Sequence, residues 1–386
     1  MLARNFFLLK LYNFLEDCRF YAAIVILYFA QITGSYTAGM GVFGLRCLAQ
    51  SVFEVPTGIL SDKFLGRKYT LVAAAVADFF AVLSYACAQD ARLMIVGAVC
   101  EGVSAAFVSG TNSAFLYETL KTENKEGEFE HYQGKACAMF QMALFCGALF
   151  GSVAIFKSYR LAFVLTLVPK FLQIVVALFF INPPSLEKGA NVLSHLKQAL
   201  RDFKKDGALR LFSIANIVDY GLGEACYQFK AAFVRSLIPA WAVSLLGALT
   251  NLLAAVSFWT ARKFIRKVGY FKLFFGGEIV CAVINTAAVL LNGIVSPFML
   301  ASTALLYGSM STAGENVFQT RFSDERRATA GSLVSLAGGL FLFVASALIG
   351  MLADATSPAV ALLTGILLPR IVTLPVYAVL FKNKAS

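Results

Sequence analysis

Apolar runs of about 20 residues recur along this chain, and they constrain its fold more than any other feature. A run of this length crosses the hydrocarbon layer of a membrane as an α-helix. A membrane-spanning β-strand needs only about ten residues with alternating polarity, a pattern that these runs lack. Charged residues make up 14% of the chain, against roughly 25% in soluble domains. We therefore expect an all-α membrane protein.

The apolar runs predict twelve transmembrane helices. They cover residues 11–33, 38–60, 69–88, 92–118, 136–157, 160–182, 207–230, 238–261, 270–292, 297–319, 328–352 and 357–381. The predicted domains are an N-terminal six-helix bundle over 1–182, a linker over 183–206 and a C-terminal bundle over 207–386. The linker pattern favours an amphipathic helix on the membrane surface, and an ordinary charged linker stays open.

Basic residues concentrate at every second connection between the predicted helices. With the N-terminus inside, most of the 33 Lys and Arg residues fall in inner connections, and few fall in outer ones, Lys230 among them. This asymmetry predicts that both termini are cytoplasmic. It also explains the net charge of +11 without nucleic acid as a partner. We expect a monomer in a lipid bilayer, the bacterial cytoplasmic (inner) membrane.

Two short segments recur with one spacing. Lys63-Phe64-Leu65 recurs as Lys263-Phe264-Ile265, and Pro169-Lys170 recurs as Pro369-Arg370, each 200 positions later. Both pairs fall on corresponding parts of two six-helix halves. The shared offset favours a parallel internal repeat, as in transporters built from two such halves.

Arrangements of side chains that could bind a metal or carry out catalysis are scarce in this sequence. The two histidines, His131 and His195, lie in polar connections without ligand-like neighbours. The predicted helices offer neither a nucleophile–base pair nor a metal cluster. We therefore expect no enzyme, no cofactor and no bound metal.

A short motif follows the second predicted helix. It reads Gly58-Ile59-Leu60-Ser61-Asp62-Lys63-Phe64-Leu65-Gly66-Arg67-Lys68. This run resembles the signature of the major facilitator superfamily, in which Gly-x-x-x-Asp-Arg/Lys is followed by Gly-Arg-Lys/Arg. Here one extra residue separates Lys63 from Gly66. The run Glu54-Val55-Pro56-Thr57-Gly58 is similar to the E-x-P-T-G run of many bacterial members. The resemblance implies twelve helices in two six-helix pseudo-repeats that move a small solute by alternating access.

The chemistry of this loop predicts a latch between helices. Gly58 is expected to let helices approach, and Gly66 to permit a tight turn. We expect Asp62 near the N-terminus of the eleventh helix. Arg67 is expected to pair with Glu118 at the inner end of the fourth helix. The predicted gating motif comprises Gly58, Asp62, Lys63, Gly66, Arg67, Lys68 and Glu118.

Ionisable side chains within a membrane are costly, so each is a candidate functional residue. The resemblance implies that helices one, four, seven and ten line a central cavity. On these helices, the candidates for binding substrate or protons are Asp17, Glu101, Asn112, Asp219, Glu224 and Glu315. Intramembrane charges without an assigned role are Arg19, Arg46, Glu54, Lys170 and Arg370.

Several of these charges admit two interpretations. Asp17 lies near the predicted inner surface, where simple solvation is as good an account as a transport role. Arg46 and Glu54 share a helix face, which suits a structural salt bridge equally well. Asp219 and Glu224 are five residues apart and point to different faces, so at most one of them faces the cavity centre.

The pattern therefore predicts a secondary transporter of a small organic solute. Proton-coupled efflux by antiport is the first interpretation, because the E-x-P-T-G run resembles bacterial exporters. We expect one of Glu101, Asp219 and Glu224 to carry the proton, unless these acids only pair with intramembrane cations. An importer of a nutrient or metabolite, proton-coupled or facilitated, stays open, as does a transport-inactive receptor. The fifth helix carries Gly147 and Gly151 but not the Gly-Pro of drug antiporters.

Overall fold

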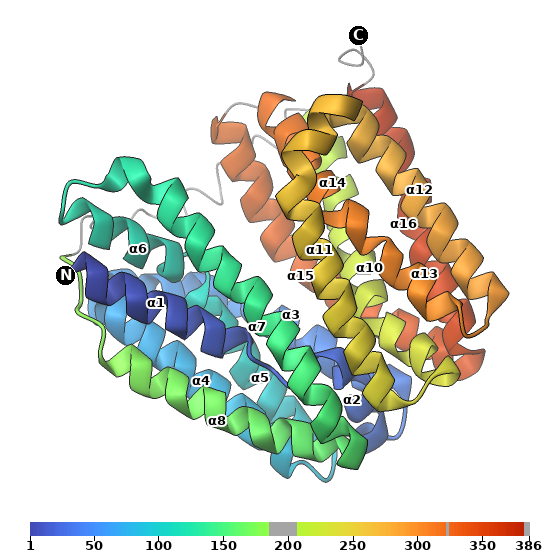
Figure 1. Ribbon diagram of the computed structural model, residues 1–386, viewed down its shortest axis with the longest axis horizontal. Helices are drawn as coiled ribbons and strands as arrows, with labels where there is room; N and C mark the ends of the chain where they lie inside the picture. Colours follow the sequence, from blue (N-terminus) through green and yellow to red (C-terminus); the bar gives the residue numbers. More distant parts are fainter. Residues whose placement is uncertain (185–206, 322–323, 382–386) are drawn as a thin grey trace.

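The computed structural model describes residues 1–184, 207–321 and 324–381, apart from the side chains of 62–63, 130, 137, 208, 315, 317–335 and 381. Within these ranges the chain is built from helices in two groups, one from each end of the sequence (Figure 1). The predicted linker helix over 183–206 lies almost entirely outside the described residues.

The N-terminal group forms six membrane-length segments, of which the first and fourth are interrupted. Its helices are α1 (Leu2–Asp17), α2 (Val25–Thr33), α3 (Tyr36–Leu60), α4 (Gly66–Cys87), α5 (Ala91–Val108), α6 (Thr111–Lys121), α7 (Phe129–Lys157) and α8 (Tyr159–Leu178). Short turns lie at η1 (Ala22–Ile24), η2 (Ser61–Leu65) and η3 (Glu126–Glu128). Helices α1 and α2 together form the first segment, and α5 and α6 form the fourth.

The C-terminal group also forms six segments, and here only the tenth is interrupted. Its helices are α10 (Gly207–Leu237), α11 (Ala240–Val268), α12 (Tyr270–Leu291), α13 (Ser296–Ser302), α14 (Ala304–Arg321), α15 (Asp324–Ala355) and α16 (Pro358–Phe381). The prediction of twelve helices in two six-helix halves is therefore confirmed. Four ends were wrong by seven residues or more. The first helix begins at Leu2 rather than 11, and the fifth begins at Phe129 rather than 136. The seventh continues to Leu237 rather than 230, and the eighth continues to Val268 rather than 261.

The start of α1 and the end of α16 lie at the same end of the bundle (Figure 1). We call this the terminal end, and it also carries the 61–66 turn. The opposite end, called the far end, carries the turn at Gly34 and Ser35 and the turn between α15 and α16. Helix α1 is anchored by Asn5, whose amide donates to the carbonyl of Ile181 at 2.9 Å and accepts from its N–H at 3.0 Å. These contacts explain why the first helix starts so early.

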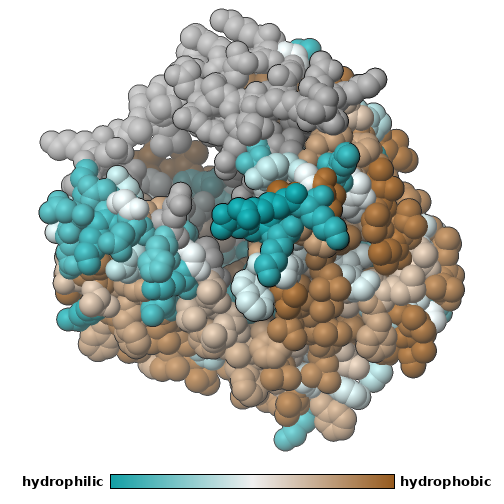
Figure 2. Space-filling model, turned by 45° about the horizontal axis from the view of Figure 1, so that its top comes forward, coloured by the Kyte–Doolittle hydropathy of each residue, from teal (hydrophilic) through white to brown (hydrophobic). Residues whose placement is uncertain are grey.

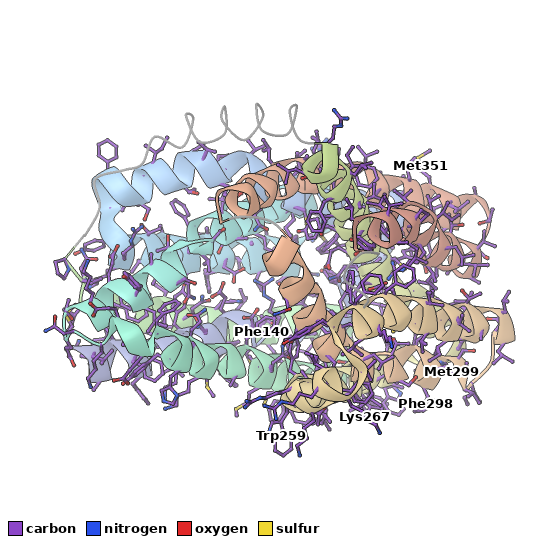
Figure 3. All side chains as sticks on the ribbon, turned by 90° about the horizontal axis from the view of Figure 1, so that it is seen from above. Phe140, Trp259, Lys267, Phe298, Met299 and Met351 are labelled. Carbon is purple, nitrogen blue, oxygen red and sulfur yellow. The ribbon has the colours of Figure 1, made fainter. Side chains whose placement is uncertain are left out.

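The flanks of the bundle expose apolar side chains. Trp259 is 88% exposed and Phe298 is 56% exposed, and both lie at the edge of the molecule when it is viewed from above (Figure 3). Figure 2 shows brown apolar atoms over the lower and right-hand flanks, with teal polar groups gathered toward the terminal end. An apolar flank with polar groups at the end is the surface that a bilayer requires.

Eight helices of the described part are long and apolar enough to cross a membrane by length and composition. The four segments outside that set are the first, second, seventh and tenth. These segments are interrupted or carry buried charge. Polar transmembrane segments belong in the interior, against protein or a cavity, rather than against lipid.

The two halves meet along two helix pairs, α3 with α15 and α7 with α11. A Cβ at Gly44 would lie 2.9 Å from the Cα of Phe343, so these backbones touch directly. Between residues described on both sides, the hydrogen bonds joining the halves all lie toward the far end. Asp354 accepts from the N–H groups of Tyr36 and Thr37 at 2.9 and 2.8 Å. We call this contact the far-end latch.

Candidate functional site

The extra residue in the loop motif is accommodated as a π-turn. Residues Ser61–Leu65 form one π-helical turn between α3 and α4. Such a turn absorbs a residue that a regular helix has no room for. Gly66 follows with a φ of 70°, which confirms the tight turn expected of this glycine. The side chains of Asp62 and Lys63 lie outside the described residues, so the contact expected between Asp62 and the eleventh helix stays a prediction.

The ion pair predicted within the motif is present. Arg67 Nε lies 3.0 Å from Glu118 Oε1, and Glu118 is 5% exposed. This pair joins α4 to α6 inside the N-terminal half. A Cβ at Gly58 would meet no described atom within 4 Å, so the close helix approach expected there stays a prediction. The gating role of the motif stays a prediction.

Buried charges from five segments converge in the N-terminal half. They are Arg19, between α1 and α2, Arg46 of α3, Asp78 of α4, Glu101 of α5 and Lys170 of α8. We call these five residues the N-cluster. Lys170 is 0% exposed and its Nζ lies 2.6 Å from Asp78 Oδ2. Full burial of an ion pair requires close geometry, because each charge has lost its water.

Arginines link the rest of the N-cluster. Arg19 lies between both acids, at 2.5 Å from Glu101 Oε1 and 3.4 Å from Asp78 Oδ2. Arg46 Nε is 3.3 Å from the same Glu101 oxygen, and the Tyr85 hydroxyl donates to the other at 2.9 Å. Glu101 is thus engaged by two arginines and a tyrosine. It was a predicted proton carrier, and its role in proton coupling stays a prediction.

The interruption of the first segment positions the N-cluster. Helix α1 ends at Asp17, and its last carbonyls lose their helical donors. Lys170 Nζ and Arg19 Nε, the latter at 3.2 Å, donate to the freed carbonyl of Glu16. A Cβ at Gly151 would lie 2.1 Å from the carbonyl of Phe20. Glycine therefore lets α7 approach the interrupted backbone, which gives this residue a role independent of any antiporter motif.

Asp17 lies in mid-segment rather than near the membrane surface, because the first helix begins nine residues earlier than predicted. Its half-buried carboxylate has no hydrogen-bond or ion-pair partner among the described residues, and it lies within electrostatic range of Arg19. Asn112 Nδ2 donates to Asn13 Oδ1 at 2.6 Å, joining α6 to α1. Ser109 donates to Glu54 at 3.0 Å, so Glu54, like Arg46, contacts the fourth segment.

A second charge group lies in the C-terminal half. Arg370 of α16 lies 2.6 Å from Glu278 of α12 and 3.4 Å from Asp219 of α10. We call these three residues the C-cluster. Their side chains are 23%, 18% and 38% exposed, so this group is more open than the Lys170–Asp78 pair. Glu278 was not among the predicted site residues, although its spacing of 200 from Asp78 signals the repeat.

The remaining predicted acids have different surroundings. Glu224 of α10 is half-buried, and it accepts a hydrogen bond from Gln228 Nε2 at 2.9 Å but contacts no described cation. Glu315 lies on α14, and its side chain is outside the described residues. Among the described acids of the seventh segment, Glu224 is therefore the one without a salt bridge.

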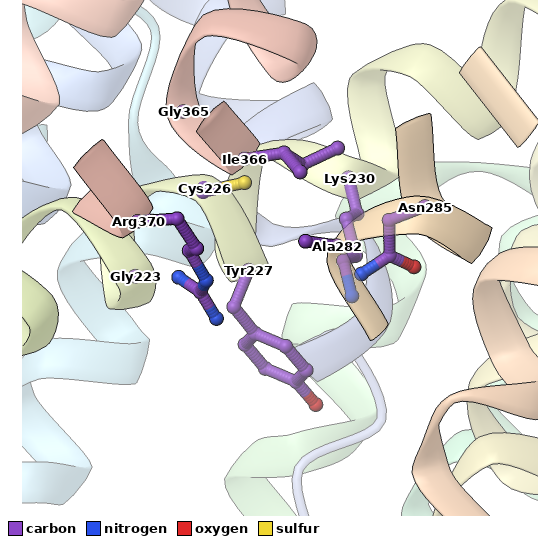
Figure 4. A pocket seen from close by; sticks show the side chains of 9 residues that line it. All are labelled: Gly223, Cys226, Tyr227, Lys230, Ala282, Asn285, Gly365, Ile366 and Arg370. Atoms are coloured by element: carbon purple, nitrogen blue, oxygen red, sulfur yellow. The ribbon is translucent and has the colours of Figure 1, made fainter. Parts of the chain in front are cut away.

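Lys230 was placed in an outer connection by the sequence pattern, and this was wrong. It lies within α10, seven residues before the helix ends at Leu237. It lines a cavity between α10, α12 and α16, together with Gly223, Tyr227, Asn285 and Arg370 (Figure 4). No acid of the described chain lies within salt-bridge distance of Lys230. The cavity adjoins the C-cluster, because Arg370 belongs to both.

Comparisons with known proteins agree with this architecture. An uncharacterized MFS-type transporter of Methanocaldococcus jannaschii is 23% identical over 352 residues, covering 87% of each chain. Among solved structures, a mutant of the nucleoside transporter NupG superimposes with a TM-score of 0.81 at 13% identity, covering 98% of this chain and 99% of the other. A D-xylose-proton symporter gives a TM-score of 0.74 at 13% identity, covering 98% and 97%.

A third solved structure is a bacterial homolog of the human lysosomal transporter Spinster, in an inward-facing and unoccupied conformation. It has a TM-score of 0.70 at 15% identity and covers 98% of this chain and 95% of its own. At these identities the solved structures establish the fold alone. The sequence pattern of the family described as Major Facilitator Superfamily matches residues 11–346. The chain therefore belongs to the Major Facilitator Superfamily, a family of membrane transporters.

Proposed function

We propose that this protein is a secondary active transporter that moves a small organic solute by alternating access, with a proton gradient as the driving force. One observation carries the proposal. Each half holds its own buried charge cluster, whereas the hydrogen bonds between described residues of the two halves gather at the far end. Two internally cross-linked halves whose described hydrogen bonds to each other gather at one end are suited to rocking about that end.

The proposed membrane orientation puts the terminal end in the cytoplasm. The excess of Lys and Arg in connections at that end supports this orientation. The far-end latch then closes the outer face. Release of Asp354 from the N-terminus of α3 is the step that opens the outer face, because α3 and α15 separate there.

Glu224 is the proposed proton carrier. A carrier must be reachable from the cavity and must be able to exist in a neutral form. Glu101 is the one described acid within salt-bridge distance of Arg46, so losing its charge would leave that arginine uncompensated. Asp219 is already engaged in an ion pair with Arg370. Glu224 forms no salt bridge with a described cation. Its partner Gln228 is a neutral amide that tolerates both forms of the carboxyl group.

The experiment is transport into liposomes under an imposed pH gradient, with a panel of labelled organic solutes. Glu224→Gln is expected to abolish gradient-driven accumulation and to retain solute exchange without a gradient. Glu126→Gln, at an exposed position of η3, is the control and is expected to retain both. Full accumulation by Glu224→Gln would contradict proton coupling at this residue.

Direction is read in the same assay. Efflux by antiport, the first choice, predicts solute accumulation in liposomes that are acidic inside. Import by symport is the second candidate, and it predicts accumulation when the outside is acidic. A protein that moves no solute in either gradient and catalyses no exchange would have to be a receptor.

A further inference from the structure

The cavity between α10, α12 and α16 is lined by three nitrogen donors from three helices. They are the ammonium of Lys230, the amide of Asn285 and the guanidinium of Arg370, which converge in Figure 4. The cavity has a volume of about 80 Å³. Drug-sized ligands occupy pockets of about 300–1,000 Å³. This space therefore suits one functional group of a solute rather than a whole solute.

Lys230 carries a charge that the described protein leaves unmatched. Its ammonium lies 5.8 Å from the centroid of the Tyr227 ring. A lone ammonium inside a helix bundle is costly unless an anion or water reaches it. Arg370 differs, because Glu278 and Asp219 already share its charge. Among the side chains that line the cavity, Lys230 is thus the cation without a described acid within salt-bridge distance.

The other two donors also have free hydrogen-bonding capacity. Arg370 uses Nη1 and Nη2 in its ion pairs, and its buried Nε has no hydrogen-bond partner. The Thr303 hydroxyl lies 3.5 Å from the amide oxygen of Asn285, which leaves the amide nitrogen as the donor group. A cavity with donors to spare and one unmatched positive charge is chemically complementary to a carboxylate.

We propose that this cavity binds a carboxylate group of the transported solute, between Lys230, Asn285 and Arg370. The proposal rests on the proposed transport function and specifies its substrate class as organic monoanions. A dianionic phosphate fits less well, because the carboxylates of Asp219 and Glu278 lie just across Arg370. Within the predicted membrane-spanning segments, acids outnumber bases, which favours cationic or neutral solutes. That count misleads here, because it includes paired acids and places Lys230 outside the membrane.

A reporter thiol at position 223 tests the site without transport. Gly223 lines the cavity, and a Cβ there meets no described atom within 4 Å, so Gly223→Cys fits without a clash. The thiol is modified with methanethiosulfonates that carry either a sulfonate or a trimethylammonium group. Its modification is quantified by peptide mass spectrometry, and the unsubstituted protein reports background modification of Cys226.

The expected result is preferential reaction with the sulfonate reagent. Lys230→Met is expected to reduce the ratio of sulfonate to trimethylammonium rates by about tenfold, because it removes the nearest unmatched charge. Lys230→Arg keeps the charge and is expected to preserve the ratio. An unchanged ratio in Lys230→Met overturns the proposal. If Lys230→Met does not fold, the protection experiment below still decides, because it needs only Gly223→Cys.

Protection of the thiol by acetate, acetamide or chloride identifies the kind of group that the cavity binds. Acetate is expected to slow modification at position 223, whereas acetamide, of the same shape and no charge, is not. Equal protection by acetamide, or protection by chloride and not by acetate, overturns the carboxylate site. Neither readout requires transport. A chain that shows acetate protection but moves no solute in liposomes contradicts the proposed function, while one that transports without acetate protection contradicts only this site.

Discussion

The two halves place charged residues at equivalent positions but with opposite balance. Three pairs stand 200 positions apart: Arg19 and Asp219, Asp78 and Glu278, and Lys170 and Arg370. In the N-terminal half one acid lies between two cations, and in the C-terminal half one cation lies between two acids. The repeat thus conserves the places of the charges and inverts the sign of one of them, at Arg19 and Asp219.

Burial separates the roles of these two groups. The Lys170–Asp78 pair is sealed, at 0% and 1% exposure, whereas the C-cluster borders a cavity. Removing one partner of a sealed pair strands the other charge, whereas an exposed partner regains water. The N-cluster is therefore expected to stabilise the N-terminal half, and the C-cluster is expected to take part in solute transport. Substitutions at equivalent positions test this division.

The largest effect is expected from Asp78→Asn. It leaves the ammonium of Lys170 buried without its carboxylate, at a cost of about 3–5 kcal/mol. Thermal unfolding in detergent is expected to show a large loss of stability. The double variant Asp78→Asn, Lys170→Met removes both charges and is expected to recover most of it. If Asp78→Asn is as stable as the unmodified protein, the Lys170–Asp78 ion pair has no structural role.

The interruption of the first segment is a second asymmetry, since α10 at the equivalent place is continuous. The N-terminal half has Gly151 against the carbonyl of Phe20, and the C-terminal half has Met351 at the equivalent position. Gly151→Ala is expected to cost about 2 kcal/mol by overpacking. Its control is Gly134→Ala on the same helix, where a Cβ meets no described atom within 4 Å.

The same thermal-unfolding assay compares the stability of Gly151→Ala with that of Gly134→Ala. Gly134→Ala is expected to be neutral or slightly stabilising, because alanine favours a helix over glycine by about 1 kcal/mol. Equal destabilisation by both variants would show that α7 does not depend on contact with the interrupted backbone.

The far-end latch lies between the halves and belongs to neither cluster. Asp354→Ala removes the acceptor for two N–H groups at the start of α3, and loss of a helix cap costs about 1 kcal/mol. We expect a small loss of stability but a clear rise in far-end accessibility. A thiol introduced by Gln31→Cys, beside Asp354 in a far-end cavity, measures this accessibility. Unchanged labelling would indicate that α3 and α15 stay closed without the latch.

The smallest effect on stability is expected from Glu278→Gln, the counterpart of Asp78→Asn. Arg370 keeps Asp219 as a partner and is partly exposed, so the cost is expected to stay below about 1 kcal/mol. Transport, in contrast, is expected to change, because Arg370 also lines the solute cavity. A stability loss as large as that of Asp78→Asn would contradict the expected difference in role between the N-cluster and the C-cluster.

The helix count and the Arg67–Glu118 pair could be predicted because both depend on local information. An apolar run must cross the membrane, and a motif arginine at the membrane surface seeks a nearby acid. The interruption after Asp17 could not be predicted, because no helix-breaking residue marks it. Contacts from distant segments hold it open: Thr166 accepts from the N–H of Phe20 at 3.1 Å, and Gly151 leaves room.

The position of Lys230 shows a different limit. Hydropathy locates the centre of a segment but not its end, and α10 extends well beyond the apolar run that revealed it. A lysine at the apparent edge of a span is ordinarily solvated, so nothing local distinguished Lys230 from an anchor. The Lys170–Asp78 pairing was similarly hidden, since the two residues come from helices far apart in the sequence.

The polarity of the first two segments has a consequence for how the chain enters a membrane during synthesis. An arginine or aspartate at the centre of a helix costs about 2.5–3.5 kcal/mol when a single helix partitions from the translocon into lipid. The first segment carries Asp17 and Arg19, and the second carries Arg46. The carboxylates that neutralise the two arginines lie on α4 and α5, which are synthesised later. We therefore expect these two segments to be retained beside the translocon until α4 and α5 emerge, and a chain truncated after α3 to fail to integrate.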